Sequence, residues 1–119
     1  MSGQSLLPSN PQEQTKHLLL FYDKIQQMTP EERKAIPVYS GVIKYFPKAL
    51  QEVARVSKVG NDQHNPGQPL HWDRSKSTDE ADALVRHLLD AGKIDTDGMR
   101  HTAKVAWRAL ALLEKELEK

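Results

Sequence analysis

Apolar side chains recur at spacings of three and four residues along most of this chain, a pattern typical of helices that bury one face. The first such stretch covers residues 11 to about 28, with a proline in its first turn. A second helix start is predicted at Thr29–Glu32, where threonine is the cap, proline takes the first helical position and glutamate the third. This short helix must end before Pro37, and residues 37–46 are compatible with either a helical turn or an extended segment.

Two further helices are predicted in the middle of the chain. Pro47 opens one that we expect to end at Gly60, because glycine readily adopts the left-handed conformation that closes many helices. Ser77 caps the other, with Glu80 completing a capping box, and Gly92 ends it. The predicted buried faces are Leu50, Val53, Ala54 and Ser57 in the first helix and Ala81, Leu84, Val85 and Leu88 in the second.

The last predicted helix, which follows a DTDG turn, has the most regular apolar repeat. Its apolar positions are Met99, Ala103, Ala106, Leu110, Leu113 and Leu117. A seam of this kind needs a partner helix, either within the chain or in a second copy. For one domain of this size we expect it to serve the internal core.

These patterns predict an all-α fold, since no stretch alternates in the manner of a half-buried strand. We expect a small helical bundle of about four main helices, with a long ordered loop between the second and third core helices. Residues 1–10 form a flexible N-terminal tail in this interpretation, and residues 11–119 form a single helical domain.

The loop is the richest source of candidate chemistry. Between Lys58 and Ser77 the chain reads KVGNDQHNPGQPLHWDRSKS, and loops of this length in small domains are usually functional or disordered. Its mixed composition indicates an ordered binding loop. The candidate ligand-binding residues in it are Lys58, Asn61, His64, Asn65, Trp72, Arg74 and Lys76. Alternatively, the loop is a turn-rich connection in which Trp72 packs into the core of the helical bundle and has only a structural role.

Three carboxylates on predicted helices are candidate metal ligands: Glu52, Asp79 and Asp82. The two aspartates are three residues apart, so they share a helix face, as a hard cation with oxygen ligands requires. Each also has a structural alternative, which is an ion pair at helical spacing or a favourable position near a helix N-terminus.

Basic side chains on the later helices are the remaining candidates. His87 is a general acid or base, a ligand inside the bundle, or simply a packed or capping residue. His101, Lys104 and Arg108 share a face that either meets an anionic ligand or is solvated.

Composition narrows the function classes. A net charge of +1 gives no electrostatic case for duplex nucleic acid or for a membrane surface. The absence of cysteine excludes disulfides, thiolate zinc sites and a cysteine nucleophile. Because the chain has no apolar run of membrane-spanning length and no secretory signal pattern, we expect a cytoplasmic protein. The common phosphate-loop and hydrolase motifs are absent from the sequence.

Three runs, RKAIPVYSGVIKYFPKAL, GNDQHNPGQPLHWDRSKS and ADALVRHLLDAG continuing through DTDGMRHTAKVAWRALALLEKELE, carry a family resemblance over about residues 33–118. Together they resemble the phage-associated family called the dATP/dGTP diphosphohydrolase N-terminal domain, which is related to the MazG-like all-α nucleotide pyrophosphohydrolases. The resemblance implies a helical, usually oligomeric protein in which helix carboxylates bind magnesium. In those enzymes water splits a (deoxy)nucleoside triphosphate into the monophosphate and pyrophosphate.

The carboxylate pattern departs from that of the MazG-like enzymes, which carry E-E-x-x-E on one helix and E-x-x-D on a later one. Here the first helix offers Glu52 alone, and the later helix offers Asp79-x-x-Asp82, the same spacing with aspartate in place of glutamate. Three carboxylates suffice for one magnesium ion, which keeps several of its waters, and manganese can take its place.

The leading hypothesis is therefore a magnesium-dependent pyrophosphohydrolase of purine deoxynucleoside triphosphates that forms homo-oligomers. In it Glu52, Asp79 and Asp82 hold the ion, with Glu52 and His87 as the catalytic residues. The predicted phosphate ligands are Lys58, Arg74 and Lys76, supported by Lys104 and Arg108, while Trp72 or His64 contacts the base. The alternatives are a helical oligomer that binds a nucleotide without cleaving it, as in phage counter-defence, and a loop that serves only as an oligomer contact.

Overall fold

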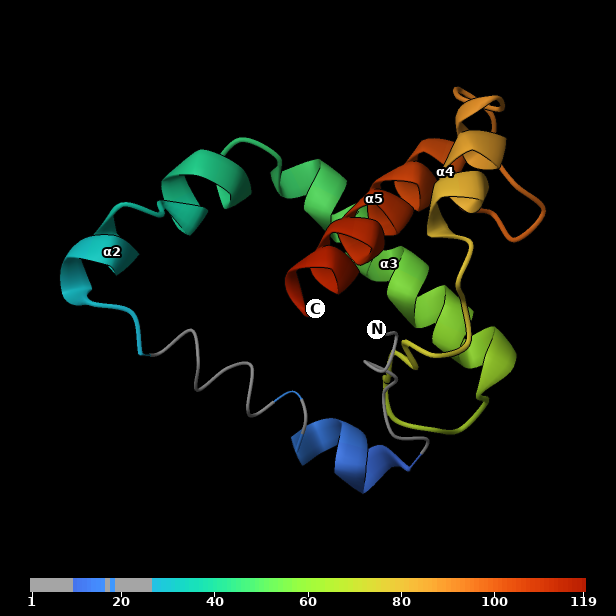
Figure 1. Cartoon of the computed structure of the whole chain (residues 1–119). Helices are drawn as coiled ribbons and strands as arrows, with labels where there is room; N and C mark the ends of the chain where they lie inside the picture. Colours follow the sequence, from blue (N-terminus) through green and yellow to red (C-terminus); the bar gives the residue numbers. More distant parts are fainter. Residues whose placement is uncertain (1–9, 17, 19–26) are drawn as a thin grey trace. The chain divides into compact units, whose positions relative to one another are not determined.

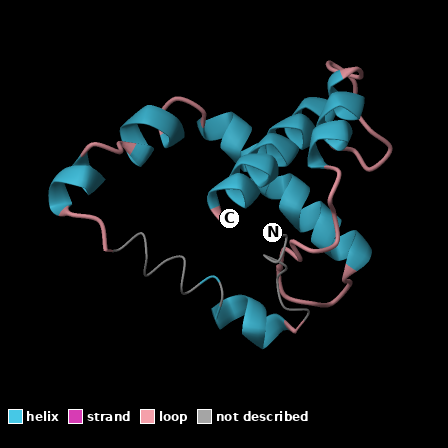
Figure 2. Ribbon diagram, viewed as in Figure 1, coloured by secondary structure: helices cyan, strands magenta, loops and turns pink. Residues whose placement is uncertain are grey.

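The computed structural model describes residues 10–16, 18 and 27–119 of the chain (Figure 1). The chain divides into two compact units, one comprising residues up to Pro47 together with Glu118, the other Lys48–Leu117 together with Lys119. In the described residues all regular elements are helical, apart from one isolated bridge between Ile94 and Arg100 (Figure 2). The predicted all-α fold is confirmed. None of the described helices combines the length and the apolar character that crossing a membrane requires.

The first unit contains the short elements before Pro47. Residues 11–16 and 18 are helical, while residues 17 and 19–26 of the predicted first helix lie outside the described residues. Helix α2 spans Pro30–Lys34, and its start is the predicted cap, because Thr29 Oγ1 accepts a hydrogen bond from the Glu32 amide at 3.1 Å. Element η1, Tyr39–Ile43, is a π-helical turn, so residues 37–46 contain a helical turn rather than an extended segment.

Three longer helices follow: α3 (Pro47–His64), which lies in the second unit from Lys48 on, and α4 (Glu80–Leu88) and α5 (His101–Leu117), which lie wholly in it. The predicted end of α3 at Gly60 is wrong, because the helix continues for one more turn. Asn61 explains the extension: its buried side chain donates to the Gln68 carbonyl at 3.0 Å, which ties the following turn to the last part of the helix. The connection to α4 is therefore shorter than the predicted loop and begins at Asn65.

The start of α4 also differs from the prediction. Asp79, not Ser77, occupies the cap position, and its side chain makes no capping hydrogen bond. Glu80 does not complete a capping box; its side chain is buried and bonded to Arg108 and Lys115 of α5. Because both cations lie on α5, the Glu80 carboxylate points toward α5 and not toward the start of its own helix. The helix ends at Leu88, one turn before Gly92, whose φ of 90° closes the following turn.

The faces of α4 and α5 that pack together are not the predicted apolar stripes. On α5, Met99 and Ala103 are buried as predicted, but Leu110, Leu113 and Leu117 are 51%, 50% and 68% exposed. On α4, Ala83 is buried while Ala81, Val85 and Leu88 are exposed. The assignment of the seam to the internal core is thus wrong for the C-terminal half of α5. The reason is polar pairing between the two helices. Glu80 of α4 bonds to Arg108 of α5, and His87 of α4 contacts His101 of α5. The polar side of α5 therefore faces α4, and its leucines lie on the other side.

A tight hairpin joins α4 to α5. The Asp95 amide donates to the Met99 carbonyl at 2.8 Å, and the Gly98 amide donates to the Asp95 carbonyl at 2.9 Å. Gly98 has a φ of 82°, a conformation that glycine adopts without strain, so the predicted DTDG turn is confirmed. The hairpin sets α4 beside α5 and brings His87 next to His101, which is distant in sequence.

Candidate functional site

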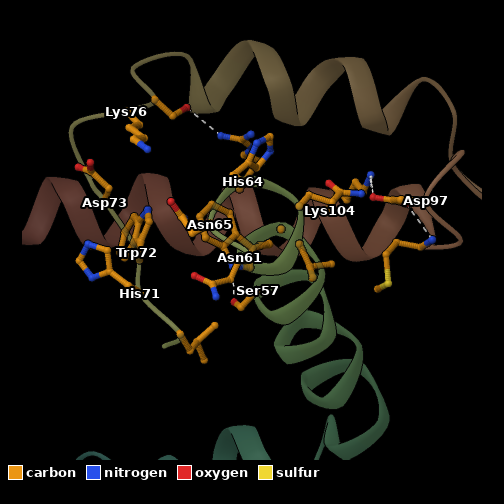
Figure 3. Close-up of a pocket in the computed structure, with 18 of the residues that line it drawn as sticks. Ser57, Asn61, His64, Asn65, His71, Trp72, Asp73, Lys76, Asp97 and Lys104 are labelled. Atoms are coloured by element: carbon orange, nitrogen blue, oxygen red, sulfur yellow. Dashed lines mark hydrogen bonds and ion pairs between the residues drawn. The ribbon is translucent and has the colours of Figure 1, made fainter. Parts of the chain in front are cut away.

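A cavity of about 480 Å³ lies in the second unit, between α3, the loop that follows it, α4 and α5 (Figure 3). Its wall includes eight of the residues that the sequence singles out: Asn61, His64, Asn65, Trp72, Lys76, His87, Lys104 and Arg108. Sites for small molecules typically measure about 300–1,000 Å³ and combine apolar walls with a few polar groups. In size and lining, the cavity fits that class of site.

Five predicted site residues do not line the cavity. Glu52 pairs with Arg55 at 2.8 Å on the surface of α3, and Lys58 pairs with Asp62 at 2.9 Å. Asp79 pairs with Arg86, Asp82 is exposed, and the Arg74 guanidinium lies 4.1 Å from the centroid of the Trp72 ring. Hydrogen bonds from Arg86 and Ser77 lower the pKa of Asp79 and keep this carboxylate charged.

The predicted magnesium ligands are not brought together. In the described part of the chain, the metal-binding side chains with ligand atoms within 4.8 Å of one another are His87, Asp95 and His101, a set that contains none of the three predicted carboxylates. An ion held by Glu52, Asp79 and Asp82 does not fit this arrangement, since a single ion needs its ligands to converge.

Two tryptophans form one wall of the cavity. The rings of Trp72 and Trp107 meet edge to face, with centroids 5.5 Å apart and an interplanar angle of 76°. Trp107 Nε1 donates to Ser57 Oγ at 2.8 Å, which fixes the ring between α3 and α5. Because Arg74, two residues further along the loop, stacks on the Trp72 ring, the loop tryptophan has a defined position and contributes an aromatic surface.

Asn61 places an unused acceptor at the cavity. The residue is 5% exposed, and its Nδ2 is committed to the Gln68 carbonyl. Its Oδ1 is buried and accepts no hydrogen bond from the described residues. A buried acceptor without a donor costs about 1–3 kcal/mol, so a ligand with an N–H or O–H group is favoured at this point.

The cations of the wall differ in how far their charge is already neutralised. Lys104 Nζ lies 2.7 Å from both Asp95 Oδ2 and Asp97 Oδ2, and Arg108 pairs with Glu80 at 2.8 Å. The hydrogen bond from Lys104 lowers the pKa of Asp95 to about 2, so that pair is ionised at neutral pH. The Lys76 ammonium, in contrast, makes no hydrogen-bonded ion pair in the described residues, although its charge helps to lower the pKa of Asp73, and Figure 3 shows it at the side of the cavity away from Lys104.

His87 contacts His101 through the two Nδ1 atoms, which are 2.9 Å apart. Burial lowers the pKa of His87, and the nearby charge of Lys104 adds to the effect. The imidazole is therefore neutral at pH 7, the form that accepts a proton or gives a lone pair to a metal.

Several residues of the wall escaped the sequence interpretation as functional residues: Ser57, His71, Asp73, Asp97 and Trp107. For Asp97 a signal is present, because the acidic DTDG turn stands directly before a helix whose basic face includes Lys104. For Trp107 the signal is its position between Lys104 and Arg108, on the polar side of the apolar repeat.

The structure is that of a small all-α protein with a cavity whose lining includes aromatic and basic side chains. The chain matches the family described as dATP/dGTP diphosphohydrolase, N-terminal, over residues 30–119. It belongs to that family. No curated protein and no solved structure gives a significant match to the chain.

Proposed function

We propose that this protein binds a purine deoxynucleoside triphosphate in the cavity and hydrolyses it to the monophosphate and pyrophosphate. The observation that supports this best is the lining of the cavity, where aromatic rings, a buried acceptor and basic side chains lie around a space of about 480 Å³. These are the groups that a base and a chain of phosphates require. The family to which the chain belongs is named for hydrolases of dATP and dGTP.

The base would contact the aromatic and amide part of the wall. Adenine and guanine each carry an exocyclic amino group, which can supply the donor that Asn61 Oδ1 lacks. His64 and the surface of Trp72 that Arg74 leaves open offer apolar contact to the ring.

The phosphates would pair first with Lys76, a cation of the cavity wall whose charge reaches Asp73 without a hydrogen-bonded ion pair among the described residues. Lys104 and Arg108 already face carboxylates, so their charge is largely neutralised before a ligand arrives. Neutral His87 in the cavity wall can accept a proton from the attacking water.

Magnesium enters this proposal as part of the substrate. It retains several waters and commonly binds through substrate phosphates with only one or two protein carboxylates. The carboxylates of the cavity wall are Asp73 and Asp97, which makes them better candidates to meet such an ion than Glu52, Asp79 or Asp82. Manganese could substitute for magnesium in the same role.

The test is an incubation of the protein with each common nucleoside and deoxynucleoside triphosphate in the presence of magnesium. We expect release of the monophosphate and pyrophosphate, fastest with dATP or dGTP. The absence of turnover with every one of them contradicts the hydrolase proposal.

A second candidate function, binding of a nucleotide without cleavage, is favoured by one observation: the three helix carboxylates predicted to hold magnesium do not converge. In this case calorimetry detects tight binding of an intact nucleotide that EDTA does not weaken, and no product forms. Such a protein suits a counter-defence role in which a phage sequesters a nucleotide signal.

We also propose that the protein forms homo-oligomers. The exposed half of the α5 repeat, Leu110, Leu113 and Leu117, provides an apolar strip on the helix that contributes Lys104, Trp107 and Arg108 to the cavity. A strip of this kind is stabilised when a second copy covers it. Light scattering after size exclusion measures the mass directly.

A further inference from the structure

The pair of histidines at the end of α4 and the start of α5 has a geometry that the proposed nucleotide site does not explain. His87 Nδ1 and His101 Nδ1 are 2.9 Å apart, and Asp95 Oδ2 lies 3.9 Å from His101 Nδ1. All three ligand atoms fall within 4.8 Å of one another. We propose that these atoms form a binding site for one divalent transition-metal ion of the class that includes iron, cobalt and nickel.

The distance between the two ring nitrogens fits an ion with octahedral geometry. With metal–nitrogen bonds of about 2.1 Å, two ligands at right angles lie about 3.0 Å apart, whereas a tetrahedral arrangement separates them by about 3.4 Å. The observed 2.9 Å between the nitrogens matches adjacent octahedral positions, whereas Asp95 Oδ2, which lies 3.9 Å from His101 Nδ1, has to approach by about 1 Å to take the third position. Two imidazoles and one carboxylate leave three positions open to water or a ligand.

The ligand types select against magnesium. Magnesium prefers oxygen donors, whereas imidazole nitrogen suits the later divalent ions. Without an ion, a proton on one Nδ1 links the two rings by a hydrogen bond. With an ion bound, both rings carry their proton on Nε2 and turn an Nδ1 lone pair to the metal, so no net proton is released.

The charges around the cluster are compatible with a divalent cation. Asp95 and Asp97 contribute two negative charges and Lys104 one positive charge, while Arg108, whose charge also reaches His87, is paired with Glu80. Lys104 has three donors and pairs with Asp97 as well as Asp95, so it keeps a partner when Asp95 Oδ2 turns to the ion.

The site is partly shielded and held by the hairpin. The His101 and Asp95 side chains are 13% and 22% exposed. The Thr96 amide donates to Asp95 Oδ1 at 2.7 Å, which orients the carboxylate and leaves Oδ2 toward the histidines. Such outer hydrogen bonds are typical of metal sites, where they fix the ligand before the ion binds.

His87 also lines the cavity, so the ion would lie at its edge. An ion on Nδ1 of His87 leaves no lone pair there for a proton, and metal binding and proton acceptance at that atom exclude each other. The metal site is nevertheless tested without any nucleotide, so its failure and the failure of the hydrolase proposal are separate results.

The experiment is a titration of the full chain with cobalt(II) alone, followed by visible absorption and by equilibrium dialysis with elemental analysis. We expect one cobalt per chain, with the weak absorption bands of a six-coordinate ion. The substitutions His87→Gln, His101→Gln and Asp95→Asn should each weaken binding at least tenfold. His71→Gln is the matched control, because Figure 3 shows His71 at the opposite side of the cavity from Lys104.

Asp95→Asn keeps the result interpretable if a histidine variant fails to fold, because the asparagine oxygen still accepts from the Thr96 amide and Lys104 keeps Asp97 as its partner, while the charge of Asp95 is lost. Absence of cobalt binding to the unaltered protein overturns the proposal. It is equally overturned if His71→Gln weakens binding as much as the cluster variants do, or if the cluster variants bind cobalt as well as the unaltered protein does.

Discussion

The inner and outer faces of α4 and α5 are opposite to what amphipathic helices usually show. Where the two helices meet, the contacts include a buried carboxylate with two cations and a pair of histidines. On the outside lie leucines and a valine that are half exposed or more, among them Leu88, Leu113 and Val85. Hydrogen bonds and ion pairs therefore decide which sides of α4 and α5 meet, while the regular leucine repeat of α5 stays on the surface.

The largest expected effect is on the outer face. Leu113→Glu places a charge in the proposed contact between copies, where a carboxylate without a partner is strongly disfavoured. We expect complete loss of the oligomer, seen as a fall to the single-chain mass in light scattering. Gln51→Glu is the control, since it adds the same charge at an exposed position of α3. A single-chain mass for the unaltered protein would show that the outer face has no second copy on it.

The next effect concerns the inner face. Glu80→Ala leaves Arg108 and Lys115 without the carboxylate that they share, and we expect a loss of about 2–3 kcal/mol in the free energy of unfolding. This value allows for the partial exposure of the two cations. Urea unfolding followed by tryptophan fluorescence measures it. Glu52→Ala, which removes an exposed ion pair on α3, should cost only about 0.5 kcal/mol or less. Equal losses for the two variants contradict the polar organisation of the inner face.

The same carboxylate should make stability depend on pH on the acid side. Burial opposes the ionisation of Glu80, but hydrogen bonds from Lys115, Ser77 and Arg108 outweigh it and lower its pKa below the ordinary 4.5. A carboxyl whose pKa is lower in the folded state stabilises the fold fully above pH 4.5, and this contribution is lost as the pH falls through the lowered value. Urea midpoints measured from pH 6 down to pH 3 should fall less steeply for Glu80→Gln. A slope that the substitution leaves unchanged assigns the acid sensitivity to other groups.

A smaller effect tests whether the polar region binds phosphate. Lys76 and Lys58 both come from the segment predicted to bind a nucleotide, but only Lys76 lines the cavity, while Lys58 pairs with Asp62 outside it. We expect Lys76→Ala to weaken dATP or dGTP binding roughly tenfold, the loss of one charged contact, and Lys58→Ala to leave it unchanged. Calorimetry with the intact nucleotide gives both values. Similar losses for the two lysines would indicate general electrostatic attraction instead of a defined site.

Local features of the fold were readable from the sequence because they depend on neighbouring residues. The cap at Thr29, the DTDG turn and the helical character of the segments after Pro47 and before Leu117 follow from short-range hydrogen bonds and backbone preferences. Eight of the predicted ligand-binding or catalytic residues line one cavity for a related reason: a polar loop between helices has to cover the space that the helices leave.

The sequence by itself thus determined an all-α protein with its candidate chemistry concentrated in and around one loop. Only the tertiary structure decided which side of each helix turns inward, because that depends on partners far apart in the chain, such as Glu80 with Lys115. For the same reason it separated Glu52, Asp79 and Asp82 and joined His87, Asp95 and His101. Apolar periodicity predicts that the leucines of α5 are buried. In the structure the buried Glu80 carboxylate pairs with two cations of α5 instead, and this contact between distant residues cannot be predicted from spacing along the chain.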